Sequence, residues 1–92
     1  MRTVTAHLSS SGGPWRLYVV LMGVSHWPDF QWERPGPVPT IAERREALAL
    51  LGYEPVRGAE WSWIEDTATY DPSSPVVLIA AIKVRKLTWG AG

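Results

Sequence analysis

The sequence predicts an α+β fold in which two strands, one helix and two further strands follow one another in the order ββαββ. Three observations support this class. Two alternating segments joined by Gly-Gly come first, a capped helical segment follows, and a strongly apolar segment comes last. Because neighbouring strands have short connections, we expect a four-stranded, mostly antiparallel sheet with the helix packed across one face. Residues 1–92 are expected to form one domain.

The first two predicted strands, residues 2–10 and 15–23, alternate between apolar and polar positions. The turn between them contains Gly12 and Gly13, and glycine adopts the positive φ angles that tight turns use. The connection is too short for a parallel crossover, so the two strands should form an antiparallel hairpin. The side chains expected on its apolar face are Val4, Ala6, Leu8, Trp15, Leu17, Val19 and Leu21.

Residues 24–39 form a long predicted loop that is rich in tryptophan and proline. Each proline lacks an N–H group and restricts the residue before it, so neither a helix nor a central strand is expected there. Loops of this length are uncommon in compact domains and are usually functional or disordered. The aromatic residues argue against disorder, and we expect them to pack back onto the sheet. The prolines are Pro28, Pro35, Pro37 and Pro39, and the aromatic residues are Trp27, Phe30 and Trp32.

The clearest local signal is a helix predicted over residues 41–51. Thr40 is a favourable N-cap, and Glu43 stands three residues further on, which is the spacing of a capping box. Gly52 is suited to the left-handed position that ends a helix, and Pro55 prevents continuation. The expected apolar stripe consists of Ile41, Leu48 and Leu51, with Ala47 beside it.

Two further strands are predicted after the helix, at residues 58–66 and 76–89. In the first, Trp61 and Trp63 alternate with polar residues and should point the same way. The second begins with seven consecutive apolar residues, VVLIAAI, a pattern typical of strands buried on both faces. Its end, KVRKLTW, carries three cations and Trp89.

A helix this short leaves part of the predicted sheet uncovered. Eleven helical residues span only about 16 Å, which is too little to cover four strands. Apolar residues nevertheless occur on both sides of the second and fourth predicted strands. We therefore expect the second face to be covered by the aromatic residues of segment 24–39 or by a second copy of the protein.

Composition excludes several classes of function. The chain has no cysteine, which rules out disulfides and thiolate metal sites and is compatible with a reducing, cytoplasmic location. Its two histidines, His7 and His26, lie nineteen positions apart, so no metal site and no cofactor are expected. No nucleophile motif or paired carboxylates are present, which predicts a protein that is not an enzyme. The longest apolar run is too short to cross a membrane.

We expect the protein to act as a small binding module through protein–protein contacts, with another protein or a second copy as the partner. Six tryptophans in 92 residues are several times the ordinary usage, and tryptophan is enriched at the energetic centres of interfaces. Aromatic residues and interleaved charges in the predicted loop fit this composition. The candidate binding residues are Trp27, Phe30, Trp32, Arg34, Trp61 and Trp63.

Two alternatives remain open. The first is a nucleic-acid-binding module that uses a basic and aromatic strand, with candidate residues Tyr18, Lys83, Arg85 and Lys86. A net charge of zero argues against it, since nucleic-acid binders usually carry a basic surplus. The same cations could instead protect an edge strand from aggregation. The second alternative is a small-molecule binder with a tryptophan-walled pocket between the loop and the sheet.

Four segments, WRLYVVLMG, PVPTIAERREALALLGYEP, AEWSWIED and VVLIAAIKVR, occur in this order and span most of the chain. Together they resemble a family of short uncharacterised actinobacterial proteins, a domain of unknown function typical of high-GC soil bacteria. The most specific parts are the aromatic start of the second strand, the Leu-Gly-Tyr end of the helix and the Trp-x-Trp strand. The resemblance implies a soluble cytoplasmic accessory protein and transfers no catalytic residue, because the family has no assigned activity.

Overall fold

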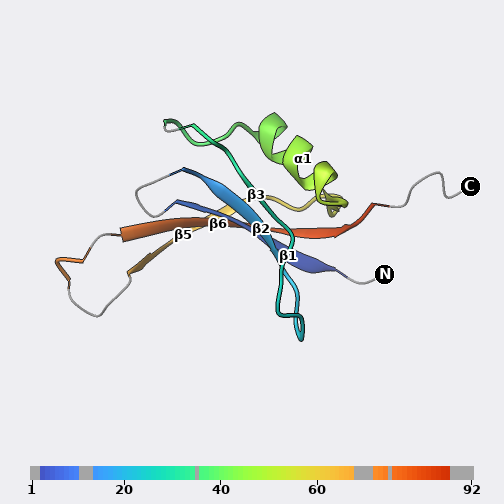
Figure 1. Ribbon diagram of the computed structural model, residues 1–92, viewed down its shortest axis with the longest axis horizontal. Helices are drawn as coiled ribbons and strands as arrows, with labels where there is room; N and C mark the ends of the chain where they lie inside the picture. The colour runs from blue at the N-terminus through green and yellow to red at the C-terminus, as the bar shows by residue number, and fades with distance from the viewer. Residues whose placement is uncertain (1–2, 11–13, 35, 68–71, 75, 88–92) are drawn as a thin grey trace, which may run out of the picture.

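The computed structural model describes residues 3–10, 14–34, 36–67, 72–74 and 76–87 (Figure 1). Its elements, in chain order, are β1 (Val4–Ser10), β2 (Arg16–Val20), β3 (Asp29–Gln31), α1 (Ile41–Leu50), β4 (Tyr53–Pro55), β5 (Ser62–Thr67) and β6 (Val76–Lys86). The expected α+β class is therefore confirmed, with strands on both sides of a single helix in the described part of the chain. Trp89 and the turn glycines Gly12 and Gly13 lie outside the described residues.

The strands form one antiparallel sheet in the order β3-β2-β1-β6, and β4 and β5 both pair with the remaining edge of β6. The predicted hairpin of the first two strands is confirmed, with Ala6 opposite Val19 and Leu8 opposite Leu17. The predicted number of four strands is wrong, because the described residues form a sheet of six. The two additional strands, β3 and β4, have three residues each and lie at the edges.

β3 is a strand inside the segment that was predicted to contain no regular structure. Its three residues lie between Pro28 and Pro35 and keep their own N–H groups, so a short edge strand is compatible with the prolines on either side. Phe30 stands opposite Leu17, and the Trp32 N–H donates to the Trp15 carbonyl at 3.0 Å. Proline therefore limits the length of this strand without preventing it.

β4 and β5 follow one another along β6 and are separated by an excursion of the chain. On β6, Val84 pairs with Pro55 and Ala81 pairs with Ser62. The six residues 56–61 therefore correspond to only two residues of β6, Ile82 and Lys83, and most of them must leave the sheet. The Val56 N–H still donates to the Lys83 carbonyl at 2.9 Å, and the backbone then turns away through Gly58, whose φ is +84°. The excursion brings Ala59 and Trp61 onto the core.

The helix has the predicted capping box. The Thr40 hydroxyl accepts from the Glu43 N–H, and the Glu43 carboxylate accepts from the Thr40 N–H. Gly52 follows the C-cap with φ +89°, as predicted. The predicted apolar stripe is wrong at its first position, because Ile41 is 53% exposed whereas Arg44 is buried. Arg44 is buried because its guanidinium lies against the indoles of Trp61 and Trp63.

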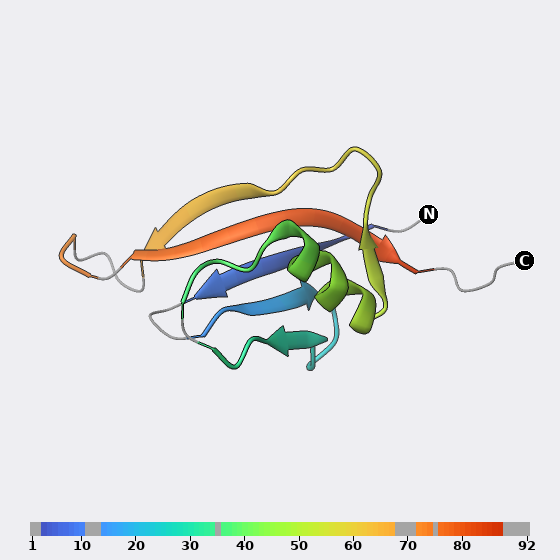
Figure 2. The ribbon, with the colours of Figure 1, turned by 90° about the horizontal axis from the view of Figure 1, so that it is seen from above.

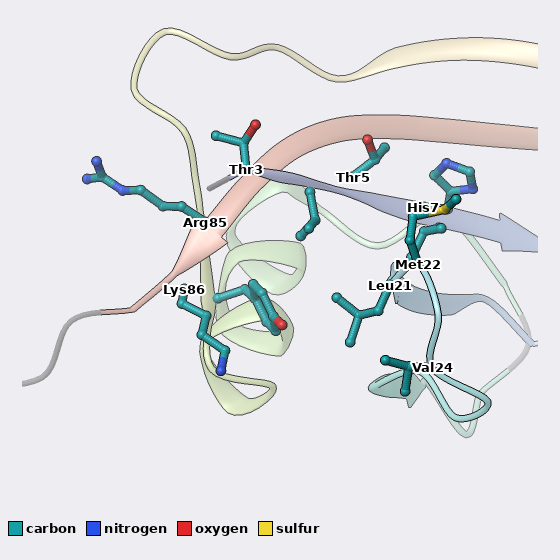
Figure 3. Close-up of a pocket in the computed structure, with 11 residues that line it drawn as sticks. Thr3, Thr5, His7, Leu21, Met22, Val24, Arg85 and Lys86 are labelled. Carbon is teal, nitrogen blue, oxygen red and sulfur yellow. The ribbon is translucent and has the colours of Figure 1, made fainter. Parts of the chain in front are cut away.

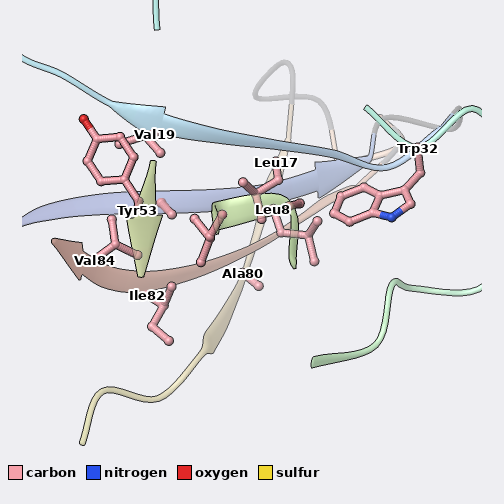
Figure 4. Packing of buried hydrophobic residues seen from close by; sticks show 11 residues of the cluster. Leu8, Leu17, Val19, Trp32, Tyr53, Ala80, Ile82 and Val84 are labelled. Carbon is pink, nitrogen blue, oxygen red and sulfur yellow. The ribbon is translucent and has the colours of Figure 1, made fainter. Parts of the chain in front are cut away.

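The core lies between the sheet and α1, which packs against β2 and β4 (Figure 2). Alternation brings every second side chain of β1, β2 and β6 to this helix face, as predicted for β1 and β2. Figure 4 shows Trp32, Leu8 and Val84 among the side chains gathered there. The buried apolar residues are Ala6, Leu8, Leu17, Val19, Trp32, Ala47, Leu48, Tyr53, Ala80, Ile82 and Val84.

β6 was predicted to be buried on both faces over its first seven residues, and this prediction is wrong for its beginning. Pairing with β1 ends at the Ser10–Leu78 pair, so the start of β6 has only β5 beside it. Val76 and Leu78 are 52% and 42% exposed. Figure 2 shows β5 and β6 extending together beyond the rest of the sheet. We call β5 with residues 76–79 of β6 the arm.

Candidate binding site on the open sheet face

The face of the sheet opposite α1 has no layer packed on it in the described structure, and we call it the open face (Figure 1). Strand register assigns its residues, because side chains directly opposite each other in antiparallel strands share a face. It is mixed in character, with aromatic, aliphatic and charged side chains. Its residues are Thr5, His7, Ser9, Arg16, Tyr18, Val20, Asp29, Gln31, Glu54, Ser62, Ile64, Asp66, Val77, Ile79, Ala81, Lys83 and Arg85.

Three aromatic rings form a row on the open face. The Trp27 indole stacks on the Tyr18 ring, with centroids 6.1 Å apart and planes inclined by 13°. The His7 ring meets the Tyr18 ring edge-on, with centroids 5.3 Å apart. Tyr18 and His7 are directly paired across β2 and β1. We call these three residues the aromatic row: Trp27 comes from the β2–β3 connection, Tyr18 from β2 and His7 from β1.

The connection between β2 and β3 holds Trp27 in this position. It extends to the side of the sheet away from α1 (Figure 1) and turns at Gly23, whose φ is +75°. The Trp27 Nε1–H donates to the Leu21 carbonyl at 2.7 Å, and the Val19 N–H donates to the Pro28 carbonyl at 3.0 Å. Trp27 is 43% exposed, so a large aromatic surface faces solvent in a defined orientation.

Charges on the open face are balanced. The Arg16 guanidinium pairs with Asp29 at 3.1 Å and lies 5.5 Å from the Tyr18 centroid. Arg85 pairs with Glu54 at 3.0 Å, across β6 and β4. Lys83 and Asp66 add one charge of each sign to the same face. The face as a whole therefore has no surplus of either sign.

His7 is the titratable member of the aromatic row. Partial burial of His7 on β1 lowers its pKa below 6.5, because desolvation disfavours the charged imidazolium. The imidazole is therefore neutral at neutral pH and behaves as part of an aromatic surface. Protonation at lower pH would introduce a charge beside Tyr18.

The other aromatic residues predicted in segment 24–39 lie on the helix face. Trp32 is 9% exposed and belongs to the core, and Phe30 is half-buried beside it with centroids 4.9 Å apart. Arg34 pairs with Glu43 at 2.8 Å and so braces the start of α1. The segment is thus divided: Trp27 contributes to the open face, while Phe30, Trp32 and Arg34 stabilise the helix side.

Trp61 and Trp63 surround a cation that the sequence did not single out. The Arg44 guanidinium lies 5.0 Å from the Trp61 ring and 5.7 Å from the Trp63 ring, and its Nε donates to the Pro39 carbonyl at 2.9 Å. Trp15 packs edge-on against Trp63, 5.9 Å away. Burial lowers the pKa of Arg44 through desolvation. Trp61 and Trp63 therefore bind the Arg44 side chain of α1 and help to hold the helix on the sheet.

The three cations of β6 do not form one basic strip. Alternation sends Lys83 and Arg85 to the open face, whereas Lys86 stands opposite Tyr53 on the helix side. Tyr18 shares the open face with Lys83, with β1 between their strands. The sequence predicted these four residues as a single nucleic-acid site, and the fold keeps only part of that set together.

The described residues hold neither a metal-binding cluster nor a membrane-spanning helix. They contain no group of three or more His, Asp or Glu side chains placed to hold a metal ion. Their single helix, α1, has ten residues, and a helix of that length does not reach across a bilayer.

The fold and the open face define an α+β domain with one sheet face closed by a helix and the other bearing a fixed row of aromatic rings. The chain belongs to a family of unknown function, DUF6303, whose model matches residues 2–91. This confirms the resemblance to an uncharacterised domain. No curated protein and no solved structure matches the chain.

Proposed function

We propose that this protein is a non-catalytic binding module that uses the open face to bind another protein surface, and that a second copy of the chain is that surface. The observation that carries the proposal is Trp27, a large aromatic side chain held 43% exposed by stacking on Tyr18 and by a hydrogen bond to Leu21. Rigid exposed aromatic residues lose little conformational entropy on binding and are typical interface anchors.

Aliphatic side chains extend the same surface toward the arm. Ile64 is 57% exposed and stands opposite Ile79 on the open face. Two side chains whose pKa values are lowered are engaged in structure: Glu43 caps α1, and Arg44 lies between indoles. This distribution supports a binding role for the exposed apolar surface. We also propose a cytoplasmic location, which the absence of cysteine supports.

Charge placement along β6 favours self-association. Lys83 and Val77 are open-face positions of β6 on either side of Ala80, and Asp66 stands opposite Val77 on β5. With two open faces packed together, a two-fold axis that lies between the sheets, parallel to them, and crosses β6 near Ala80 would therefore bring Lys83 of each copy close to Asp66 of the other. Isologous interfaces require this kind of self-complementarity. Ile79 and Ile64 would lie near the centre of such an interface.

Light scattering over a range of protein concentrations tests the proposal. We expect a reversible dimer for the native chain and a monomer for Trp27→Arg and for Ile64→Arg, because each places a cation in an apolar part of the interface. Leu50→Arg is the matched control, since Leu50 is 75% exposed on α1, away from the open face. A native chain that is monomeric at every concentration would contradict self-association, and so would a Leu50→Arg monomer.

A charge exchange tests the predicted geometry of the dimer. Lys83→Glu alone and Asp66→Lys alone should each weaken association, because like charges then face each other across the two-fold axis. The double variant should restore association to near the native level. If the double variant remains as weak as the singles, the dimer does not use this arrangement.

Single-stranded nucleic acid is a second candidate, because Tyr18, Trp27 and Arg16 together offer stacking surfaces and a cation on an uncovered sheet. The acidic residues Asp29 and Asp66 on the same face oppose it. Tryptophan fluorescence with short oligonucleotides, at low and moderate salt, separates the two. Saturable quenching that weakens with salt would favour nucleic acid over a protein partner.

A further inference from the structure

A cavity of about 1010 Å³ lies at the end of the sheet where the β2–β3 connection leaves β2. Pairing of β1 with β2 stops at Thr5 and Val20, so the first residues of β1 and the segment from Leu21 onward are not joined. The end of β6 and Tyr53 of β4 form the other wall. No tryptophan lines this cavity, in contrast to the pocket predicted from the sequence.

The lining is mainly apolar on one wall and cationic on the other. Figure 3 shows Leu21, Met22 and Val24 on one side of the cavity and Arg85 and Lys86 on the other. Met22 is 91% exposed and Val24 is 50% exposed, so this apolar wall is open to solvent. A ligand with an apolar body would remove that surface from water.

The charged groups of the lining have one sign. Arg85 and Lys86 line the cavity, and no Asp or Glu does. Arg85 already pairs with Glu54, and its guanidinium points away from the cavity in Figure 3. Among the described residues, Lys86 belongs to none of the ion pairs. Lys86 is therefore the cation available to an anionic ligand.

We propose that this cavity binds a small amphipathic carboxylate, with its apolar body against Leu21, Met22 and Val24 and its carboxylate at the Lys86 ammonium. The combination of a large apolar wall with a few oriented polar groups is typical of small-molecule sites. The Thr3 and Thr5 side chains supply hydroxyl groups at the rim. The residues changed in the dimer test, Trp27 and Ile64, lie outside this lining, while His7 of the aromatic row belongs to it.

NMR of the full chain labelled at the methionine methyl groups and at backbone nitrogen tests the proposal. The chain has two methionines, Met1 and Met22, so the Met22 signal can be assigned with a Met22→Leu variant. Hexanoate, octanoate and decanoate are the probes. We expect saturable shifts of the Met22 methyl group and the Leu21 amide, with affinity rising about fourfold per added methylene.

Matched variants test the position of the carboxylate. At moderate salt, where distant charges are screened, Lys86→Gln should weaken decanoate binding by about fivefold. Arg45→Gln removes one positive charge from an exposed position of α1, outside the lining and away from the open face, and it should leave the affinity unchanged. Decyltrimethylammonium, which has a similar chain and the opposite charge, should bind more weakly than decanoate.

Three results would overturn the proposal. One is the absence of a saturable Met22 shift with any of the carboxylates. Another is equal binding of decanoate and decyltrimethylammonium, which would indicate an apolar surface without charge selection. The third is equal weakening by Lys86→Gln and Arg45→Gln, which would indicate a general charge effect. None of these results bears on the dimer, whose light-scattering test uses no ligand.

Discussion

At the scale of single residues, the least expected feature is a buried cation without an acidic partner among the described residues. Arg44 is 7% exposed, and its contacts are two indole faces and one backbone carbonyl. The faces of aromatic rings attract cations, and the guanidinium is planar and weakly hydrated, so it tolerates this environment better than an ammonium group. Arg44 thereby joins α1 to the chain around β5.

The stability of Arg44 variants tests this account. Arg44→Ala should lower the free energy of unfolding by about 2 kcal/mol, through loss of the cation–π contacts and of the hydrogen bond to Pro39. Arg44→Lys should recover only a small part, because an ammonium cannot lie flat against both rings. Urea unfolding followed by tryptophan fluorescence measures both. Full recovery by lysine would show that charge alone matters.

Glu43 connects the helix cap with an ion pair. The hydrogen bond from Arg34 and the backbone hydrogen bond from Thr40 lower the pKa of Glu43 from 4.5 to about 2. A carboxylate whose pKa is lower in the folded state contributes stability that is complete above its unfolded pKa and is lost as pH falls. The relevant interval therefore runs from about pH 4.5 down to about pH 2.

A Glu43→Gln variant isolates this charge, because glutamine can still accept from the Thr40 N–H in a capping box. We expect the native chain to lose more stability than the variant between pH 4.5 and pH 2, the interval set by the Glu43 pKa. Urea unfolding at a series of pH values gives the comparison. Parallel pH profiles for the two proteins would contradict the assigned cause.

The lowered pKa of His7 predicts a second pH interval in which stability falls with acid. Because burial lowers its pKa in the folded state, the unfolded chain binds protons more readily, and stability should fall as pH drops below about 6.5. His7→Gln should remove this part of the pH dependence and leave the Glu43 interval unchanged. Thermal unfolding between pH 5 and pH 8 measures it. A native profile that is flat in this range would contradict it.

At the scale of elements, the segment from β2 to α1 places aromatic residues on opposite faces of the sheet. β3 is the pivot: Trp27 precedes it and reaches the open face, whereas Trp32 follows it and enters the core. The sequence predicted that this segment packs on the sheet, but it did not predict the division. The local backbone and side-chain preferences of this segment allow a tryptophan on either face of the sheet. Which face each tryptophan takes depends on the part of the sheet that α1 leaves uncovered.

Two alanine variants distinguish the roles of these tryptophans. Trp32→Ala removes a core side chain and should cost about 3–5 kcal/mol of stability. Trp27→Ala removes a partly exposed stack and one hydrogen bond, and about 1 kcal/mol is expected. Denaturant unfolding measures the difference, and light scattering should show that folded Trp27→Ala associates less than the native chain. Equal stability losses would mean that Trp27 is also a core residue.

At the scale of the whole molecule, the sheet has a well-covered centre and a sparsely supported arm. β1 is hydrogen-bonded on both sides, by β2 and by β6. Beyond the Ser10–Leu78 pair the arm has two strands only, and along the arm Trp63, Ile64, Val76 and Leu78 are each at least 42% exposed. Regions with few buried contacts open at lower free energy than the core. The arm is therefore expected to open before the centre of the sheet.

Hydrogen exchange tests this gradient. In dilute solution, amides of β5 should exchange faster than those of β1, because local opening of the arm leaves the core intact. At concentrations where the dimer forms, protection of β5 should increase, since Ile64 lies in the proposed interface. Equal protection of β1 and β5 at low concentration would contradict the gradient. Protection of β5 that is independent of concentration would count against the interface.

The sequence by itself determined the features that depend on near neighbours along the chain. Alternation determined the apolar face of the first hairpin, and Thr40 with Glu43 and Gly52 determined where the helix starts and ends. These follow from backbone sterics and from hydrogen bonds within a few residues. The same local rules predicted that one helix would leave a sheet face uncovered.

Only the tertiary structure decided which side chains meet across the fold. It brought Arg44 between Trp61 and Trp63, stacked Trp27 on Tyr18, and left the start of β6 beyond the reach of β1. Each depends on the register and length of strands that are distant in sequence. Periodicity states which way a side chain points, but the packed elements determine whether anything stands in front of it.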